Sequence, residues 1–518
     1  MKKNIVLCSD GTGNKGGYGE DTNVYKIYKA VNIQDARDAA GGPQAQITFY
    51  DQGVGTDKSE HNKNKYWRAL SGAFGFGFEA NVKDLYHFLA RSYETGDKVF
   101  LFGFSRGGAT VRAFAGFVHT CGLLNREHPA ARPDGHFSEQ AFKLLVNQAF
   151  DCYRTHSKNP EKCRQFKAEY GVKDEIHAPS GDLKIHFVGV WDSVSALGFP
   201  KDFSVAVKWV FDAAERISDR IFPHSFYKYE LNESVENAYQ ALSIDDERKT
   251  FHPMVWNEKD CRGAEHHVEQ VWFAGVHSNV GGGYPRTGLS DVALDWMMTR
   301  AEASGLVFFP EARSDVRQGA NGHDKVYDSR DGFAIYYRYG PRDLQELGAD
   351  LRGPVALHRT AYDKLKDLSD AYAPDGLPAS FSVVETDTSV EPLAITPRDR
   401  DAWEKLRREM KGLIQRRSML YRVFVEVTMA ILVIAGILWA TEPASIVLLK
   451  SGSGILHSLA ALLSYLTPVY FENFIYAVVV KFPFVFVLML ATLYCMNRMR
   501  KTWVNRLHGV CQQMAELL

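Results

Sequence analysis

The chain has 518 residues, a net charge of −1, and 45% hydrophobic against 24% charged residues. This composition is typical of a globular protein, and the balanced charge argues against a nucleic-acid binder, which needs a basic field. Seven scattered cysteines without a C-x-x-C pair indicate free thiols in a reducing compartment. The N-terminal apolar segment is too short for a signal peptide and is predicted as a first strand.

A Gly-rich loop, DGTGN at 10–14, follows that first strand. It lacks the spacing and the lysine of a P-loop, which argues against phosphate binding. In the α/β-hydrolase plan an early strand–helix loop supplies one oxyanion-hole donor, so we expect the backbone N–H of Gly11 or Thr12 to serve here. A second strand at 47–51 and a helix at 82–93 follow, and strands separated by helices predict a mainly parallel sheet.

The central motif is VFLFGFSRGGATVR at 99–112. An apolar strand stops at G-x-S-x-G, and a helix-compatible segment follows at once, which is the context that a nucleophile elbow requires. Ser105 is therefore the predicted nucleophile, at a helix N-terminus where N–H groups and the helix dipole favour negative charge. The backbone N–H of Arg106 is the predicted second oxyanion donor.

Two later strands end in residues that complete a catalytic triad. The strand at 183–190 leads to Asp192, and a carboxylate beyond the carboxyl end of a strand is where an α/β sheet gathers its site. The strand at 268–276 leads to His277 on a Gly-rich loop. The chain order Ser, Asp, His is that of α/β-hydrolases.

Other features leave alternatives open. Asp245 and Asp246, in ALSIDDE, are alternative acids. Residues 201–233 carry a broad apolar stripe at helical spacing, which predicts either a cap over the site or a core-packing helix. No His, Cys, Asp or Glu group has metal-ligand spacing, so we expect neither a metal nor a cofactor.

The C-terminal part is apolar enough for a membrane. Residues 423–440 and 474–496 are each long enough to cross a hydrocarbon core of ~30 Å, which takes about 20 helical residues. Arginines and lysines flank both segments on the outside, so the positive-inside rule places the flanks and the N-terminal domain in the cytoplasm, at the cell inner membrane. The expected organisation is a hydrolase domain at 1–395, a basic helical linker at 396–422, two transmembrane helices with an interfacial connection at 423–497, and a cytoplasmic basic tail at 498–518.

Six motifs in chain order carry a resemblance to a known family. They are SDGTGN, YDQGVGTD, GFSRGG, VGVWDSV, ALSIDDERKTFHPMVWNE and FAGVHSNVGGGY. The set resembles the α/β-hydrolase domain of the type VI secretion phospholipase effectors of the first lipase class. The resemblance implies an esterase for phospholipid acyl chains with its nucleophile at Ser105, acid at Asp192 and base at His277. Two positions depart from the family pattern, Asn279 in place of Asp and Gln240 in place of His.

The expected protein is a membrane-anchored serine hydrolase with membrane phospholipid as its partner, in a bacterial effector or defence role. Two alternatives remain: a pore-forming effector that uses the hydrolase fold as a sensor or oligomerisation platform, and an esterase for a soluble acyl substrate. The sequence leaves the formation of a homo-oligomer open.

Overall fold

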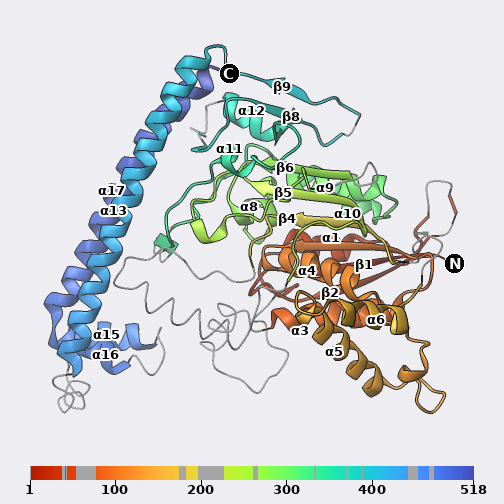
Figure 1. Ribbon diagram of the computed structural model, residues 1–518. Coiled ribbons are helices and arrows are strands. Elements are labelled where there is room, and N and C mark those ends of the chain that lie inside the picture. The colour runs from red at the N-terminus through yellow and green to blue at the C-terminus, as the bar shows by residue number, and fades with distance from the viewer. Residues whose placement is uncertain are drawn as a thin grey trace.

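The computed structural model describes the chain except residues 1, 38–40, 43, 54–76, 174–181, 196–226, 261–266, 332–333, 336, 368–371, 373, 388, 441–452 and 466–471. A nine-stranded sheet in the order β2-β1-β3-β4-β5-β6-β7-β8-β9 runs through the N-terminal region (Figure 1). All neighbours in the sheet are parallel except β8 and β9. The strands are β1 Lys3–Ser9, β2 Ala45–Asp51, β3 Lys98–Phe104, β4 Ile185–Trp191, β5 Val235–Ser243, β6 His267–Phe273, β7 Val355–His358, β8 Phe381–Val384 and β9 Leu393–Ile395. The predicted α/β class with a mainly parallel sheet is therefore confirmed.

The strand order changes direction at β1. The chain runs from β1 outward to β2 and then returns to β3 on the other side of β1. The loop after β1 therefore leads to one face of the sheet and the loop after β3 to the other. Open α/β sheets bind ligands in the crevice between two such loops. This position holds the DGTGN loop and Ser105.

Helices cover both faces of the sheet (Figure 1). One face packs against α3 to α6 and the other against α1, α9 and α10. Ile5 and Leu7 of β1 point to the first face and Val6 and Cys8 to the second, which is the two-residue alternation of a strand. Because both faces are buried, the central strands β1, β3 and β4 are largely apolar along their whole length. The helices of this region are α1 Asn23–Ala30, α3 Phe78–Ser92, α4 Arg106–Cys121, α5 Glu139–Thr155, α6 Pro160–Tyr170, α8 His277–Gly281, α9 Gly288–Ala303, α10 Pro310–Gly319, α11 Leu344–Leu347 and α12 Arg359–Asp367.

A helical hairpin lies beside the sheet. Helices α13 (Arg400–Ala440) and α17 (Pro483–Glu516) run antiparallel and side by side, with α15 (Ile455–Tyr465) and α16 (Glu472–Tyr476) near the turn (Figure 1). At its open end the hairpin is tied together by the Arg398 N–H, which donates to the Leu517 carbonyl at 2.8 Å.

The open half of the hairpin docks on the N-terminal α/β region, which is called the hydrolase region below after its expected fold. Trp403 and Met410 of α13, together with Leu507 and Cys511 of α17, are buried in one cluster with side chains of β6, β7 and β8. The expected linker at 396–422 and tail at 498–518 are instead continuous with the apolar helices and pack as part of the domain. This packing could not be recognised from the sequence. The buried positions recur only about once per helical turn, and the charged residues between them dominate the composition of both segments.

The second predicted span is not one helix. Residues 474–496 begin in α16, continue as a π-helical turn at Ala477–Lys481 and break at Phe482 before α17 starts. Pro483 explains the break, since proline has no N–H to donate and disfavours helical geometry at the residue before it, where φ is −119° and ψ 57°. Among the described residues one helix, Arg400–Ile437, is long and apolar enough to cross a membrane; an 18-residue stretch of it has a mean hydropathy of 2.0.

Several strands differ from expectation. Strand β5, VENAYQALS, was not predicted, because polar residues interrupt its apolar pattern. Strands β7 to β9 have three or four residues each, too few for a periodicity signal. The predicted cap at 201–233 lies outside the described residues up to 226, and residues 227–233 form no helix.

Candidate active site

Ser105 forms a sharp elbow between β3 and α4. Its φ of 57° and ψ of −123° are rarely adopted by a residue with a side chain and store local strain. The surrounding backbone holds this conformation, since the Ser105 N–H donates to the Trp191 carbonyl at 3.1 Å and its carbonyl accepts from the Val194 N–H at 3.2 Å. Ser105 is thereby fixed to the end of β4 as well as to β3.

The two glycines of the motif allow this close packing. A Cβ on Gly103 would lie 2.5 Å from the Gly107 carbonyl oxygen, and one on Gly107 would lie 2.1 Å from the carbonyl oxygen of Ser9. Side chains at either position would push the elbow away from β1 or from its own strand. The G-x-S-x-G spacing is therefore a packing requirement here.

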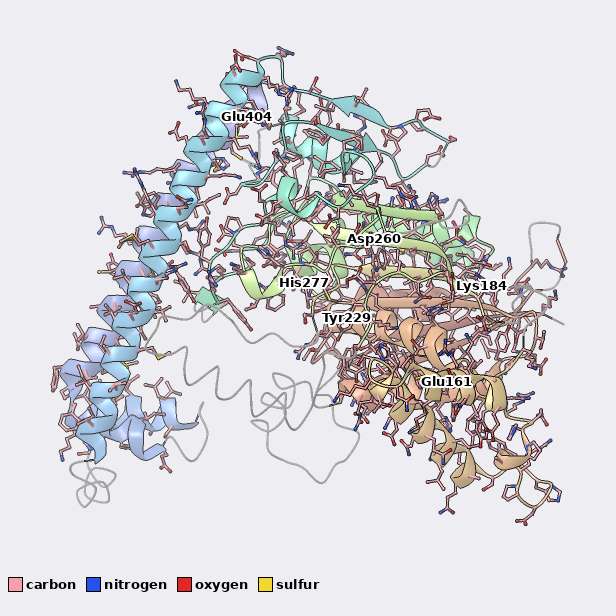
Figure 2. The ribbon with its side chains drawn as sticks, in the orientation of Figure 1. Glu161, Lys184, Tyr229, Asp260, His277 and Glu404 are labelled. Carbon is pink, nitrogen blue, oxygen red and sulfur yellow. The ribbon has the colours of Figure 1, made fainter. Side chains whose placement is uncertain are left out.

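Asp192 and His277 are joined at the carboxyl ends of β4 and β6. The His277 Nδ1 lies 2.5 Å from Asp192 Oδ2, and both side chains are buried. His277 begins the short helix α8, and Figure 2 shows it at the sheet edge that faces the hairpin. A carboxylate bonded to Nδ1 leaves Nε2 as the atom that can exchange a proton with a substrate or nucleophile.

The His277 ring lies directly beside the nucleophile elbow. Its centroid is 4.6 Å from that of Phe104, the residue before Ser105, and 5.1 Å from that of Phe251. Nε2 is buried and has no hydrogen-bond partner among the described residues. The ring is thus held between two aromatic rings with its second nitrogen available.

Arg342 neutralises Asp192 and was not singled out by the sequence. Its guanidinium donates to both carboxylate oxygens, at 2.6 and 2.9 Å, and also to Ser243 and to the Phe251 carbonyl. Burial favours the neutral form of Asp192, but the charge of Arg342 and the hydrogen bonds from His277 and Arg342 outweigh it and hold the pKa well below its usual range. A lone arginine between a proline and an aspartate carries no motif signal.

The alternative acids lie elsewhere. Asp246 accepts from the guanidinium and the backbone N–H of Arg248. Its bond with His277 comes from the backbone N–H, at 3.2 Å, and not from the imidazole. Asp245 accepts from the Gly275 N–H and the Tyr372 hydroxyl. Of the three candidate acids, Asp192 is the one bonded to the imidazole.

The DGTGN loop approaches Ser105, but its two candidate donors differ. The Gly11 N–H already donates to Asp10 Oδ1 at 2.6 Å, whereas the Thr12 N–H has no acceptor among the described residues. The Arg106 N–H, at the first position of α4, has no acceptor within the described parts either. Asp10 holds the loop, because it also accepts from the hydroxyls of Thr22 and Tyr50, both at 2.7 Å.

The two departures from the family pattern have structural partners. Asn279 Oδ1 accepts from the N–H of Val276 and of Tyr327, and its Nδ2 donates to the Lys325 carbonyl at 3.1 Å, so it fixes the loop that carries His277. Gln240 donates to the Met254 carbonyl at 3.2 Å. Within the described residues no three His, Cys, Asp or Glu side chains are arranged to hold a metal ion.

A pocket of about 570 Å³ lies next to this site, between the hydrolase region and the hairpin. Val276, Tyr327 and Arg500 are among its lining residues, whereas Ser105 and His277 are not. Its walls carry both signs of charge in pairs, such as Arg417 with Glu247 and Arg500 with Asp328. The pocket is therefore a gap in the interface between the hairpin and the rest of the protein, lined by ion pairs across that interface.

Comparison with known proteins gives a family and some remote likenesses. The uncharacterized protein YEL023C of Saccharomyces cerevisiae is 24% identical over 259 residues, which cover 48% of this chain and 32% of that protein. This chain therefore spans about a third of the length of that curated relative. A structure of the Tle1 effector bound to the VgrG spike of the type 6 secretion system aligns at a TM-score of 0.35 and 14% identity, over 65% of this chain and 78% of that one. A crystal structure of an uncharacterized protein from Pseudomonas aeruginosa aligns at a TM-score of 0.35 and 17% identity, over 82% of this chain and 59% of that one.

At these TM-scores the two structural likenesses carry no weight. The sequence model of the Tle1-like type VI secretion phospholipase effectors, catalytic domain, matches residues 3–300, which is more than half of the chain. That range includes the elbow at Ser105 and the bonded pair Asp192 and His277. The chain belongs to the Tle1-like phospholipase effector family.

Proposed function

We propose that this protein is a membrane-anchored serine hydrolase that cleaves acyl esters of bilayer phospholipids with a Ser105–His277–Asp192 triad. The observation that carries the proposal is the 2.5 Å contact between His277 Nδ1 and Asp192, next to a strained serine elbow. The family supplies the substrate class, since its members are described as phospholipase effectors.

The reaction proceeds in two steps. Ser105 Oγ attacks the ester carbonyl while His277 Nε2 takes its proton, and Asp192 stabilises the imidazolium that forms. The tetrahedral oxyanion accepts from the N–H groups of Arg106 and Thr12; one such donor typically contributes about 3–4 kcal/mol. The intermediate expels the lysophospholipid alkoxide, which His277 protonates, and water then releases the fatty acid from the acyl-enzyme.

The hairpin is the proposed membrane anchor. Helix α13 is roughly 60 Å long at 1.5 Å per residue, about twice a hydrocarbon core, so one half docks while the other inserts. Large apolar side chains are exposed along the far half, among them Val433 at 60%, Phe484 at 61% and Val487 at 61%. The first half of α13 and the last half of α17 both pack on the hydrolase, so both lie on one side of the bilayer. We take this side to be the cytoplasmic face of the inner membrane.

Fatty-acid release from phospholipid vesicles by the detergent-purified full chain tests this proposal. Release by the parent and none by Ser105→Ala is the expected result. Activity retained by Ser105→Ala would refute the triad. Vesicle leakage that persists in Ser105→Ala without fatty-acid release would indicate a pore, and turnover of soluble esters alone would indicate a soluble acyl substrate.

A further inference from the structure

The Arg106 side chain lies next to Ser105 and has no counter-ion among the residues that the structure describes. It is the first residue of α4, directly after Ser105, and it is half-buried. No hydrogen bond or ion pair of its guanidinium occurs within the described residues. Burial lowers the pKa of Arg106 to about 10, which leaves the group charged at neutral pH.

This placement costs stability for two reasons. A cation at the N-terminus of a helix opposes the helix dipole, and a partly desolvated charge without a partner is unfavourable. The other guanidinium groups around the site have acceptors: Arg112 has the Tyr229 carbonyl, Arg248 has Asp246, and Arg342 has Asp192. Among these four arginines, Arg106 is the one without an acceptor in the described part of the chain, so its guanidinium can bind a ligand.

Tyr337 connects the surroundings of Arg106 with those of His277. The charge of Arg106 interacts with Tyr337, which is 42% exposed. The Tyr337 ring meets that of Phe251 at 5.5 Å between centroids, and Phe251 packs against His277 at 5.1 Å. The partly exposed Tyr337 therefore interacts with the charge of Arg106 and, through Phe251, packs toward the His277 imidazole.

We propose that the Arg106 guanidinium binds the phosphate of the phospholipid whose ester Ser105 attacks, and thereby selects phospholipids over neutral glycerides and other uncharged esters. This inference rests on the proposed function above. A guanidinium matches two phosphate oxygens with two parallel N–H donors, and such charge-assisted bonds are stronger than neutral ones. In a glycerophospholipid the phosphate lies only a few bonds from either acyl ester, so the residue next to the nucleophile is within reach of it.

The test compares substrates that differ in the phosphate. Phosphatidylglycerol and diacylglycerol are presented to the full chain in the same mixed micelles, and p-nitrophenyl butyrate is assayed separately. We expect Arg106→Gln to lower the ratio of kcat/KM for phosphatidylglycerol to kcat/KM for diacylglycerol about tenfold or more, the range for a lost charged hydrogen bond. The ratio is the readout because the Arg106 N–H also serves the proposed oxyanion hole, so a disturbed elbow would lower the rates on all three esters together. Arg106→Lys should restore part of the phospholipid rate, because it keeps the charge without the fork.

A second readout needs no lipid. Glycerol 3-phosphate should inhibit hydrolysis of p-nitrophenyl butyrate by the parent and inhibit Arg106→Gln more weakly. Arg164→Gln is the matched control, since Arg164 is 72% exposed on α6 beside Glu161, which Figure 2 shows well away from His277. This control should not change any of the rates.

Each contrary outcome has a distinct meaning. An equal loss on all three esters in Arg106→Gln would mean that Arg106 shapes the elbow, and no loss on any would mean that it binds no phosphate; both overturn the inference and leave the phospholipase standing. If the parent cleaves both neutral esters in a Ser105-dependent way but no phospholipid, the proposed function falls and the inference falls with it.

Discussion

Replacing Arg342 with methionine tests the electrostatic support of Asp192, the proposed triad acid. Asp192 and Arg342 are both fully buried, and their two hydrogen bonds are the main compensation for burying the carboxylate. Removal of one partner of a buried ion pair typically costs about 3–5 kcal/mol, because the other charge remains without compensation. The carbonyls of Ser243 and Phe251 would also lose a donor, so we expect Arg342→Met to lose at least that much free energy of unfolding.

The pH dependence of this loss has a definite sign. In the parent the pKa of Asp192 lies below its usual range, so the charged carboxylate stabilises the fold above about pH 4 and this contribution disappears only as the pH falls through the lowered pKa. Without Arg342, burial dominates and raises that pKa. The carboxylate then destabilises the fold increasingly as the pH rises from about 4. The deficit of Arg342→Met is therefore expected to be larger at pH 8 than at pH 5.

Urea unfolding in detergent, followed by tryptophan fluorescence at both pH values, measures this deficit. Arg300→Met is the control, because Arg300 is also buried and pairs with Glu269 at 2.8 Å but lies outside the site. It should lose stability yet keep its turnover number per folded molecule, whereas Arg342→Met should lose both. An Arg342→Met protein as stable as the parent, or one whose deficit is the same at both pH values, would refute this account of Asp192.

Three further outcomes follow from the same geometry. Asp192→Asn keeps a residue type that tolerates the positive φ of 41°, but it should lose stability because Arg342 loses its counter-ion. Per folded molecule it should lower kcat for p-nitrophenyl butyrate by about 10⁴-fold, because the imidazolium loses its carboxylate; a loss below tenfold would argue for another acid. Gly107→Ala should yield little folded protein in a soluble-expression assay, because its Cβ meets backbone at 2.1 Å, while Gly509→Ala, with open space around it, should express normally. Val433→Asp should weaken flotation with vesicles, since a charge at a helix centre costs about 2.5–3.5 kcal/mol in a membrane, while Leu144→Asp on α5 should float like the parent.

The site residues that could be predicted from the sequence are those that directly follow a recognisable strand. The Ser105 elbow, Asp192 and His277 each follow a strand that reads as an apolar run, and parallel strands bring their carboxyl ends to one edge. The sequence therefore placed these residues together without any knowledge of side-chain geometry. The sequence could not show whether Gly11 or Thr12 has the free oxyanion donor. That depends on the Asp10 side chain, which accepts the Gly11 N–H in the folded loop.

Arg342 could not be found in this way. It lies 150 residues after Asp192 in the chain, in a loop between short elements, and its role appears only when that loop folds against β5. The same limit applies to the sheet beyond β6. Its strands are short, and the helices that cover them come from the far end of the chain, so their burial depends on tertiary packing rather than on local periodicity.

The hairpin illustrates a further limit of hydropathy, and it changes how anchoring should be tested. Hydropathy found the apolar half of α13 but not the docked half, where Trp403 is fully buried and Arg407 pairs with Asp343 at 3.0 Å. Asp343 is the neighbour of Arg342, so α13 contacts the loop that supports Asp192. Deletion of the hairpin would therefore uncover a core cluster and release that loop, and lost activity would say nothing about the membrane. A single charge at an exposed site such as Val433 leaves the docked half intact, so it separates anchoring from catalysis.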